Sequence, residues 1–182
     1  MTLTELKRII QEKHLHRGDY VLSSGLNSDR YFDIKAMMGG PDKPLLINEL
    51  LNYCVDKFAR AVSTDDKELV FSFGSYGGLE LGGALLVSTM SHPFNINCCF
   101  IRKQTREYGM RKMIEGKPVS PIMLVDDVVN STDTVRYGII ECQKAGYEVC
   151  GILCVINRSR LELKTVWDIP LYSLFLESDF KC

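Results

Sequence analysis

The chain has 182 residues, of which 46% are hydrophobic and 25% are charged, and its formal net charge is −1. The composition is ordinary for a globular protein, and the length suits one domain with a full hydrophobic core. The near-neutral charge excludes the basic excess that marks nucleic-acid and membrane-surface binding. No apolar run approaches the ~18 residues that a membrane-spanning helix needs.

Seven cysteines are spread through mostly apolar stretches without a CxxC pair. Buried free thiols in a reducing compartment explain them best, and the three histidines lie far from them in the sequence, which argues against a zinc site. The amino-terminal residues are charged and amphipathic, unlike a signal peptide. The sequence therefore predicts a cytoplasmic protein.

The first forty residues predict a helix followed by a hairpin. A capping box at residues 2–5 and an apolar stripe predict a helix that runs to about His14. Residues 18–33 predict two extended segments joined by a turn at residues 24–27. The hairpin ends in two aromatic residues, which either pack in the core or face a ligand.

Strands and helices alternate after the hairpin. Pro44 suits the first turn of a helix, and an apolar run at residues 69–73 predicts a buried strand. A glycine-rich turn at residues 74–78 leads into a helix of small residues at 79–90, and residues 97–101 predict another strand. Because glycines let backbone N–H groups approach an anion, the turn is either a phosphate-binding loop or a plain strand-to-helix connection.

Residues 102–116 carry a cluster of basic side chains between two predicted core strands. A charge run of this kind is usually a solvated surface loop. Its place in the chain also suits cations that close over a pyrophosphate and neutralise the charge that grows on it as it leaves.

The most informative stretch spans residues 121–134. Five mostly apolar residues predict a buried strand, Asp126 and Asp127 follow where that strand should end, and a polar run leads into a helix at about Thr134. Helix-terminal N–H groups and hydroxyl side chains favour a phosphate, whereas the carboxylates suit sugar hydroxyls or Mg²⁺. The alternative is that the acids only end the strand and a polar residue caps the helix.

The carboxyl-terminal third continues the alternation. Residues 134–145 predict a helix ended by Gly146, and residues 147–156 and 170–176 predict strands. Alternation of this kind predicts a mostly parallel sheet with helices on both faces. Right-handed crossovers would gather the ligand-binding loops at the carboxyl ends of the strands.

Residues 126–134 resemble the signature of the type I phosphoribosyltransferases, which bind 5-phosphoribosyl 1-pyrophosphate (PRPP). That family usually follows its hydrophobic run and two acids with Val-x-Thr-Thr/Ala-Gly-x-Thr. The residues that fit directly are Asp126, Asp127, Val128 and Thr134. Ser131 stands at the second small residue, whereas Asn130 replaces a usual Thr and Thr132 replaces the usual Gly.

Three further segments resemble the orotate phosphoribosyltransferases, in matching order along the chain. The hairpin residues that match are Gly18, Leu22, Ser24, Gly25, Ser28, Tyr31 and Phe32. The glycine-rich turn matches the pyrophosphate loop Gly-x-x-Tyr-Lys-Gly at Gly74, Tyr76 and Gly78. In the basic loop the matches are Arg102, Lys103 and Gly109, with Arg106 in place of a Lys and Tyr108 in place of a His. Two lysines of the family are replaced, by Ser23 and Gly77.

The resemblance implies an α/β type I phosphoribosyltransferase-like fold in a single domain of residues 1–182. A hood of about residues 1–40 would cover a core of about residues 41–182, whose mostly parallel central sheet is flanked by helices. It further implies an enzyme that transfers the 5-phosphoribosyl group from PRPP to a nucleobase, orotate or a related base, and releases pyrophosphate. The implied cofactor is Mg²⁺. The implied assembly is a homodimer in which the basic loop 102–116 reaches the neighbouring site.

The resemblance also assigns roles to individual residues. Catalysis falls to Asp126, Asp127, Lys103 and Arg106. PRPP binding falls to Arg102, Lys103, Arg106, Tyr108, Tyr76, Asp126, Asp127, Val128, Val129, Asn130, Ser131, Thr132, Asp133 and Thr134. The base would contact Tyr31, Phe32 and Arg158, the last of which falls where the family binds the orotate carboxylate. No direct protein ligand is implied for Mg²⁺, which would be held through PRPP and water near Asp126 and Asp127.

Three alternative hypotheses for the function stay open. The same scaffold can serve another base or another sugar pyrophosphate, since several family residues are replaced. It can serve as a non-catalytic PRPP or nucleotide sensor, although a pure sensor has no need of the basic loop. A receiver-like domain also ends a strand in two acids, but it has them near its amino terminus.

Overall fold

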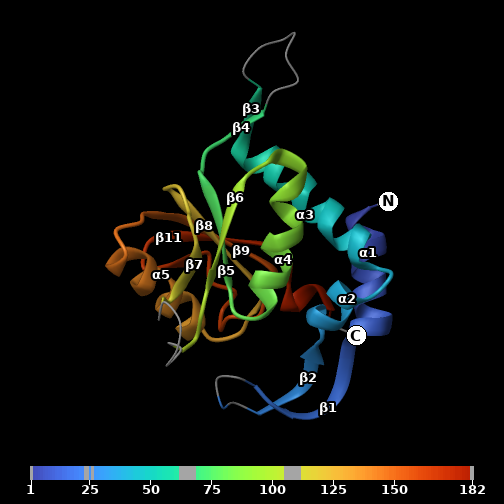
Figure 1. The fold of residues 1–182 in the computed structure, drawn as a ribbon. Coiled ribbons are helices and arrows are strands. Elements are labelled where there is room, and N and C mark those ends of the chain that lie inside the picture. Colours follow the sequence, from blue (N-terminus) through green and yellow to red (C-terminus); the bar gives the residue numbers. More distant parts are fainter. Residues whose placement is uncertain (1, 23–24, 26, 62–68, 105–111, 181–182) are drawn as a thin grey trace.

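The computed structural model describes residues 2–22, 25, 27–61, 69–104 and 112–180. Its centre is a seven-stranded sheet with the order β10-β11-β9-β8-β5-β6-β7 (Figure 1). The strands are β5 (Ser75–Leu79), β6 (Asn97–Ile101), β7 (Ile114–Gly116), β8 (Ile122–Val129), β9 (Val149–Asn157), β10 (Thr165–Val166) and β11 (Ile169–Leu176). All neighbouring pairs are parallel except the two edge pairs, β6–β7 and β10–β11. The predicted mostly parallel sheet is confirmed.

Helices cover both faces of this sheet. They are α1 (Leu3–Ile9), which continues as the π-helix η1 (Ile10–His14), α2 (Ile34–Gly39), α3 (Lys43–Phe58), α4 (Gly82–Met90) and α5 (Asp133–Lys144), with short 3-10 turns η2 (His92–Phe94) and η3 (Glu177–Phe180). The first four α-helices pack on one face, and α5 packs on the other. The predicted first helix is confirmed through His14, with the Thr2 hydroxyl accepting from the Glu5 N–H at its start.

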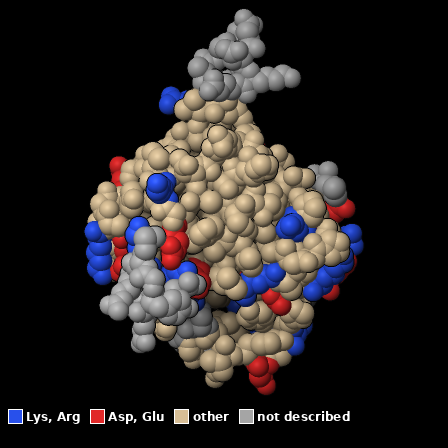
Figure 2. Space-filling view, in the orientation of Figure 1, with Lys and Arg blue, Asp and Glu red and all other residues tan. Residues whose placement is uncertain are grey.

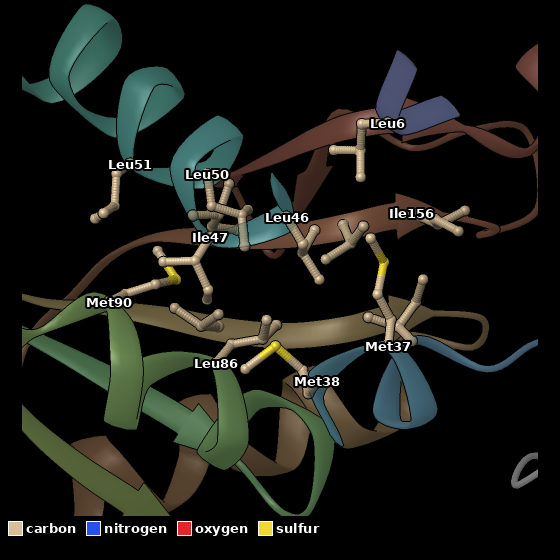
Figure 3. Close-up of a cluster of buried hydrophobic side chains, with 14 of the residues drawn as sticks. Leu6, Met37, Met38, Leu46, Ile47, Leu50, Leu51, Leu86, Met90 and Ile156 are labelled. Carbon is tan, nitrogen blue, oxygen red and sulfur yellow. The ribbon is translucent and has the colours of Figure 1, made fainter. Parts of the chain in front are cut away.

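The two faces of the sheet are buried in two hydrophobic clusters. Alternate residues of β8 divide between them, with Met123 and Val125 facing the larger cluster and Ile122 and Leu124 the smaller. Figure 3 shows how α1, α2, α3 and α4 send side chains such as Leu6, Met37, Leu46 and Leu86 into the larger cluster. Burial of each such side chain stabilises the fold by ~1.5–3 kcal/mol, so the helices are fixed relative to the sheet.

The predicted hairpin is present. Strands β1 (Leu15–Val21) and β2 (Asn27–Phe32) pair antiparallel and lie beyond one end of the sheet, close to α2 (Figure 1). Residues 24 and 26 of the predicted turn lie outside the described residues. Phe32 anchors the hairpin, because its buried ring packs edge-on against Phe180 with ring centroids 5.1 Å apart.

The prediction for residues 69–78 is wrong in two ways. The expected buried strand at 69–73 is a short outer strand, β4 (Leu69–Phe71), which pairs with β3 (Ala59–Ala61) and leaves Val70 51% exposed. The expected glycine-rich turn at 74–78 lies almost wholly in the central strand β5. Its glycines let the helix layer approach, since a Cβ at Gly78 would lie 2.6 Å from the carbonyl oxygen of Gly83 in α4.

The acid pair was predicted to follow its strand, but it lies within the strand. β8 runs on through Asp126 and Asp127 to Val129, because the long strand β9 continues beside it and pairs Val129 with Asn157. On its other side β5 pairs with β8 only as far as Val125. The acids therefore have a strand on one side only.

The remaining predicted elements are found with modest shifts. Helix α5 is confirmed; it ends at Lys144, and Gly146, with a φ of +83°, follows its C-cap Ala145. The helix expected from residue 79 begins later, at Gly82. No sequence pattern predicted α2 or the edge strands β7 and β10. No helix in the described part of the chain is long and apolar enough to cross a membrane.

Candidate active site

A cavity of about 400 Å³ opens between the hairpin and the carboxyl ends of the central strands. In Figure 2 acidic and basic surfaces meet around a hollow on this side of the molecule, above the hairpin. Four groups of residues line the cavity. They are the hairpin residues Val21, Leu22, Tyr31 and Phe32; the turn residues Glu80, Leu81 and Gly82; the residues around the acid pair, Asp126, Asp127, Val128, Asn130, Ser131 and Thr134; and three basic residues, Lys35, Lys103 and Arg158.

Most of the residues predicted from the sequence meet at this cavity. Those that line it are Tyr31, Phe32, Lys103, Asp126, Asp127, Val128, Asn130, Ser131, Thr134 and Arg158. Predicted residues that lie elsewhere are Tyr76, Arg102, Val129, Thr132 and Asp133. Arg106 and Tyr108 lie outside the described residues.

Asp126 and Asp127 form the floor of the cavity and are both almost fully buried. The Asp127 N–H donates to Asp126 Oδ1 at 2.9 Å. Burial, and next the negative charge of Asp127, raise the pKa of Asp126 well above its ordinary value. Asp126 therefore keeps its proton to a higher pH than an exposed carboxyl does.

Lys35 is a functional candidate that the sequence did not reveal. It lies in the first turn of α2, and its Nζ is 3.0 Å from Asp127 Oδ2. Burial by itself would lower the pKa of Lys35, but the charge of Asp127 and hydrogen bonds to Asp127 and Tyr31 outweigh burial and raise it. The residue stays cationic in the cavity. No sequence signal points to it, because its partner lies 92 residues away.

The turn that follows β5 approaches the acid pair closely. A Cβ at Gly82 would overlap the Asp127 carboxylate, and a Cβ at Gly83 would overlap the carbonyl oxygen of Val125. Only glycine lets the start of α4 come this near to β8. Glu80 in the same turn accepts from the Lys103 N–H at 3.1 Å. The turn that lines the cavity thus lies a few residues after the glycine-rich turn predicted at 74–78.

The position of Tyr76 does not fit its predicted role in PRPP binding. Its side chain is fully buried in the larger hydrophobic cluster, with its ring 4.8 Å from that of Phe73. It lies in the middle of β5, and alternate side chains of a strand point to opposite faces of the sheet. Tyr76 is a core residue and does not reach the cavity.

The polar run after the acid pair forms a cup at the start of α5. Asn130, Ser131 and Thr134 line the cavity there, and no side chain caps the helix N-terminus at Thr132. The Asn130 Oδ1 atom is buried without a hydrogen-bond partner among the described residues. Buried polar atoms are normally paired, so this cup has capacity for a polar ligand.

Arg158 stands at the hairpin side of the cavity, as predicted, but it already has partners. Its Nε and Nη2 atoms lie 2.9 and 2.8 Å from Glu177 Oε1, and Nη2 also donates to Ser28 Oγ at 3.0 Å. The guanidinium lies over the Phe32 ring, 5.4 Å from its centroid. These contacts fix the guanidinium and join the hairpin to the sheet.

At the start of the basic loop, Lys103 faces the cavity whereas Arg102 pairs with β7. Lys103 lines the cavity, and its charge opposes the rise in the pKa of Asp126. Arg102 instead pairs with Glu115 of β7, with Nε 3.2 Å from Oε1. Lys103 is thus the loop residue that the described part of the chain brings to the acids.

By sheet order and the placement of its cavity, the chain has the fold of the type I phosphoribosyltransferases. The structure of a phosphoribosyltransferase from Corynebacterium diphtheriae matches 98% of this chain and 97% of that one with a TM-score of 0.75, at 20% identity. The structure of Mycobacterium tuberculosis orotate phosphoribosyltransferase in complex with PRPP matches 98% of both chains with a TM-score of 0.69, also at 20% identity.

In sequence, the chain is similar to the orotate phosphoribosyltransferases. It is 28% identical over 178 residues to the orotate phosphoribosyltransferase of Pyrococcus abyssi, and the match covers 96% of this chain and 92% of that protein. No protein-family model matches the chain. The resemblance read from residues 126–134 and the hairpin is confirmed.

Proposed function

We propose that this protein is an orotate phosphoribosyltransferase, which transfers the 5-phosphoribosyl group of PRPP to orotate and releases pyrophosphate. The observation that carries the proposal is the cavity, where a buried acid pair lies beside a polar cup at a helix N-terminus. The full-length similarity to proteins named orotate phosphoribosyltransferase supports the choice of substrate.

The cavity offers complementary groups to each part of a sugar phosphate. The cup at 130–134 presents hydroxyl groups and uncapped backbone N–H groups to the 5-phosphate. Asp126 and Asp127 cannot hold a phosphate, because like charges repel, but they accept hydrogen bonds from ribose hydroxyls. Together these groups orient the ribose with its C1 atom towards the open part of the cavity.

In the transfer step, a nitrogen of the base attacks C1 and pyrophosphate leaves with the electrons of the C1–O bond. Positive charge develops on the ribose ring, and the acid pair beneath it stabilises that charge. Negative charge grows on the pyrophosphate, where Lys103 is the cation at the cavity wall. Arg106, on the same loop, is the second cation that we assign to this task.

Mg²⁺ fits the donor set as a metal that enters with its substrate. The described residues contain no group of three or more His, Cys, Asp or Glu side chains that could hold a metal by themselves. Asp126 and Asp127 offer two carboxylates, and Mg²⁺ is often bound by one or two carboxylates together with substrate phosphates and water. When bound it would neutralise charge on the pyrophosphate.

The base would bind between the hairpin and Arg158. Tyr31 and Phe32 provide aromatic surface, and the fixed guanidinium provides a cationic partner for the orotate carboxylate. Because Glu177 already shares that guanidinium, a second carboxylate would bind it less strongly than it binds a free arginine.

Two further features of the proposal concern the cell and the assembly. We place the enzyme in the cytoplasm, where the free thiols of the described cysteines are stable. We also propose a homodimer, in which the basic loop 102–116 reaches the neighbouring site. Lys103 at the start of this loop lines the cavity of its own chain, so the exchange would concern the residues beyond it.

The test is a base-panel assay. Pyrophosphate release from PRPP is measured with Mg²⁺ and orotate, uracil, adenine, hypoxanthine or nicotinate. We expect orotate to give the highest kcat/KM. Release with another base would reassign the substrate, and PRPP binding without release for any base would make the protein a sensor.

A further inference from the structure

We infer that Lys35 is a binding residue for the pyrophosphate group of PRPP, supplied by the hood segment to the acid pair of the core. The inference rests on the proposed function and adds a residue to that site. The motif matches singled out two missing cations, at Ser23 and Gly77, but none pointed to Lys35.

The first step is the position of the ammonium group. Lys35 lines the cavity, its side chain is 37% exposed, and its Nζ lies 3.0 Å from Asp127 Oδ2. A lysine ammonium has three N–H donors. Asp127 accepts one of them, and the ammonium also lies 5.7 Å from the centroid of the Tyr31 ring, so donors remain for a ligand.

The second step concerns which ligand group the ammonium faces. The Asp127 carboxylate is bounded by Lys35 and by Gly82, whose missing Cβ leaves the start of α4 against it. The cup for the 5-phosphate is built by other residues, after β8. Lys35 and the turn at 80–82 therefore both adjoin Asp127, away from the cup, and pyrophosphate is the other anionic group of PRPP, so we assign it to this end of the cavity.

The third step is the charge balance. A pyrophosphate beside two carboxylates meets repulsion unless a cation separates them. Lys35 neutralises Asp127 and thereby lets the anion approach. Asp33, two residues earlier, holds the first turn of α2 by accepting from the Ala36 N–H at 3.0 Å, so Lys35 projects from a fixed backbone.

The experiment measures binding of inorganic pyrophosphate and of ribose 5-phosphate by calorimetry, with Mg²⁺, to the wild type and to K35M, K35R and K13A. K13A is the matched control, because Lys13 also pairs with an aspartate, Asp42, at 2.9 Å but does not line the cavity. K35M removes the charge and keeps most of the side-chain length.

We expect K35M to weaken pyrophosphate binding by about 10- to 100-fold, as loss of a hydrogen bond between charged groups predicts, and to leave ribose 5-phosphate binding nearly unchanged. K35R should recover part of the loss, and K13A should match the wild type. In turnover assays the KM for PRPP should rise more than kcat falls.

Equal pyrophosphate affinity of K35M and K13A would overturn the inference. So would an equal loss of affinity for both ligands accompanied by a lower melting temperature, which would indicate a structural ion pair. A wild type that binds pyrophosphate but turns over no base would refute the proposed transferase activity while leaving the result for Lys35 readable.

Discussion

Burial raises the pKa of Asp126, and this has a consequence for stability. The folded protein holds the proton to a higher pH than the unfolded chain, whose carboxyl has the ordinary pKa of 3.8. As pH rises above that value, the unfolded state binds fewer protons than the folded state. The free energy of unfolding therefore falls with rising pH through this window.

The D126N variant tests this directly. An amide of similar shape does not ionise, so the variant should be more stable than the wild type at pH 7 by about 1 kcal/mol or more, equivalent to ~2–4 °C in melting temperature. Its stability should also depend less on pH between 4 and 7. Turnover should nevertheless fall at least tenfold, since the buried acid is lost from beneath the ribose. Thermal unfolding at several pH values checks the prediction, and a less stable D126N would contradict it.

Gly82 tests the close approach of α4 to the acid pair. In G82A the new Cβ overlaps the Asp127 carboxylate, which must shift away from Lys35. We expect kcat/KM to fall at least tenfold and stability to fall by ~1–3 kcal/mol, as for other overpacked sites. Gly39 is the control: a Cβ there meets nothing within 4 Å, so G39A should behave as the wild type. Activity of G82A equal to that of G39A would contradict the geometry.

Glu177 tests the role of Arg158. In E177Q the guanidinium loses its anionic partner at 2.8 Å but keeps its contacts with Ser28 and Phe32. The freed charge should bind the orotate carboxylate more strongly, lowering the KM for orotate several-fold and leaving the KM for PRPP unchanged. E12Q, which breaks the exposed Arg8–Glu12 pair, is the control. A raised KM for orotate would show that Glu177 mainly positions Arg158.

Site residues that lie close together in the sequence were predicted, whereas a site residue brought in by folding from a distant segment was missed. Asp126, Asp127 and the cup residues lie within nine positions, so their order alone indicated a sugar-phosphate site. Lys35 reaches Asp127 across 92 positions, and nothing in its neighbourhood marks it. Tyr76 was misassigned because a tyrosine between glycines suits a loop as well as a strand.

For the basic loop, we predict that loss of Lys103 slows turnover without unfolding the protein. K103A removes one of the three described cations that line the cavity and should lower kcat by about 10²- to 10³-fold, as for loss of one group that stabilises developing charge. The control is K117A, since Lys117 is exposed, lies after the loop and does not line the cavity, and this variant should leave kcat unchanged. Thermal unfolding should show both variants folded. Full turnover by K103A would refute the role of the loop.

Helices and strands were predicted correctly where the local sequence pattern favours the same structure as the packing of the fold. Helices α1, α3 and α5 have caps, apolar stripes or a terminal glycine in the sequence. Strand β5 was missed because glycines are poor strand formers, and only close packing of its neighbours explains them there. The continuation of β8 through the acids depends on the length of β9, which no local signal in β8 conveys.

At the scale of the whole molecule, the proposed homodimer predicts complementation. R106A lacks the loop cation and D127N lacks the acid, so each should be inactive. If the loop reaches the neighbouring site, mixed dimers contain one site with both wild-type residues, and mixing should restore about a quarter of wild-type activity. Light scattering measures the assembly, and no recovery in a mixture shown to exchange subunits would contradict the arrangement.

The order of strands and helices was enough to predict the sheet, because alternation restricts connections to a few right-handed topologies. The two antiparallel edge strands were not predictable, since β7 and β10 have only three and two residues.

The most direct test of the account is calorimetric titration of PRPP into the wild type and into a D126N/D127N double variant, with and without Mg²⁺. We expect the wild type to bind PRPP and Mg²⁺ to raise its affinity. The double variant should lose this Mg²⁺-dependent increase in affinity. Absence of binding to the wild type, or equal Mg²⁺-strengthened binding to both proteins, would contradict the claim that this cavity is a PRPP site.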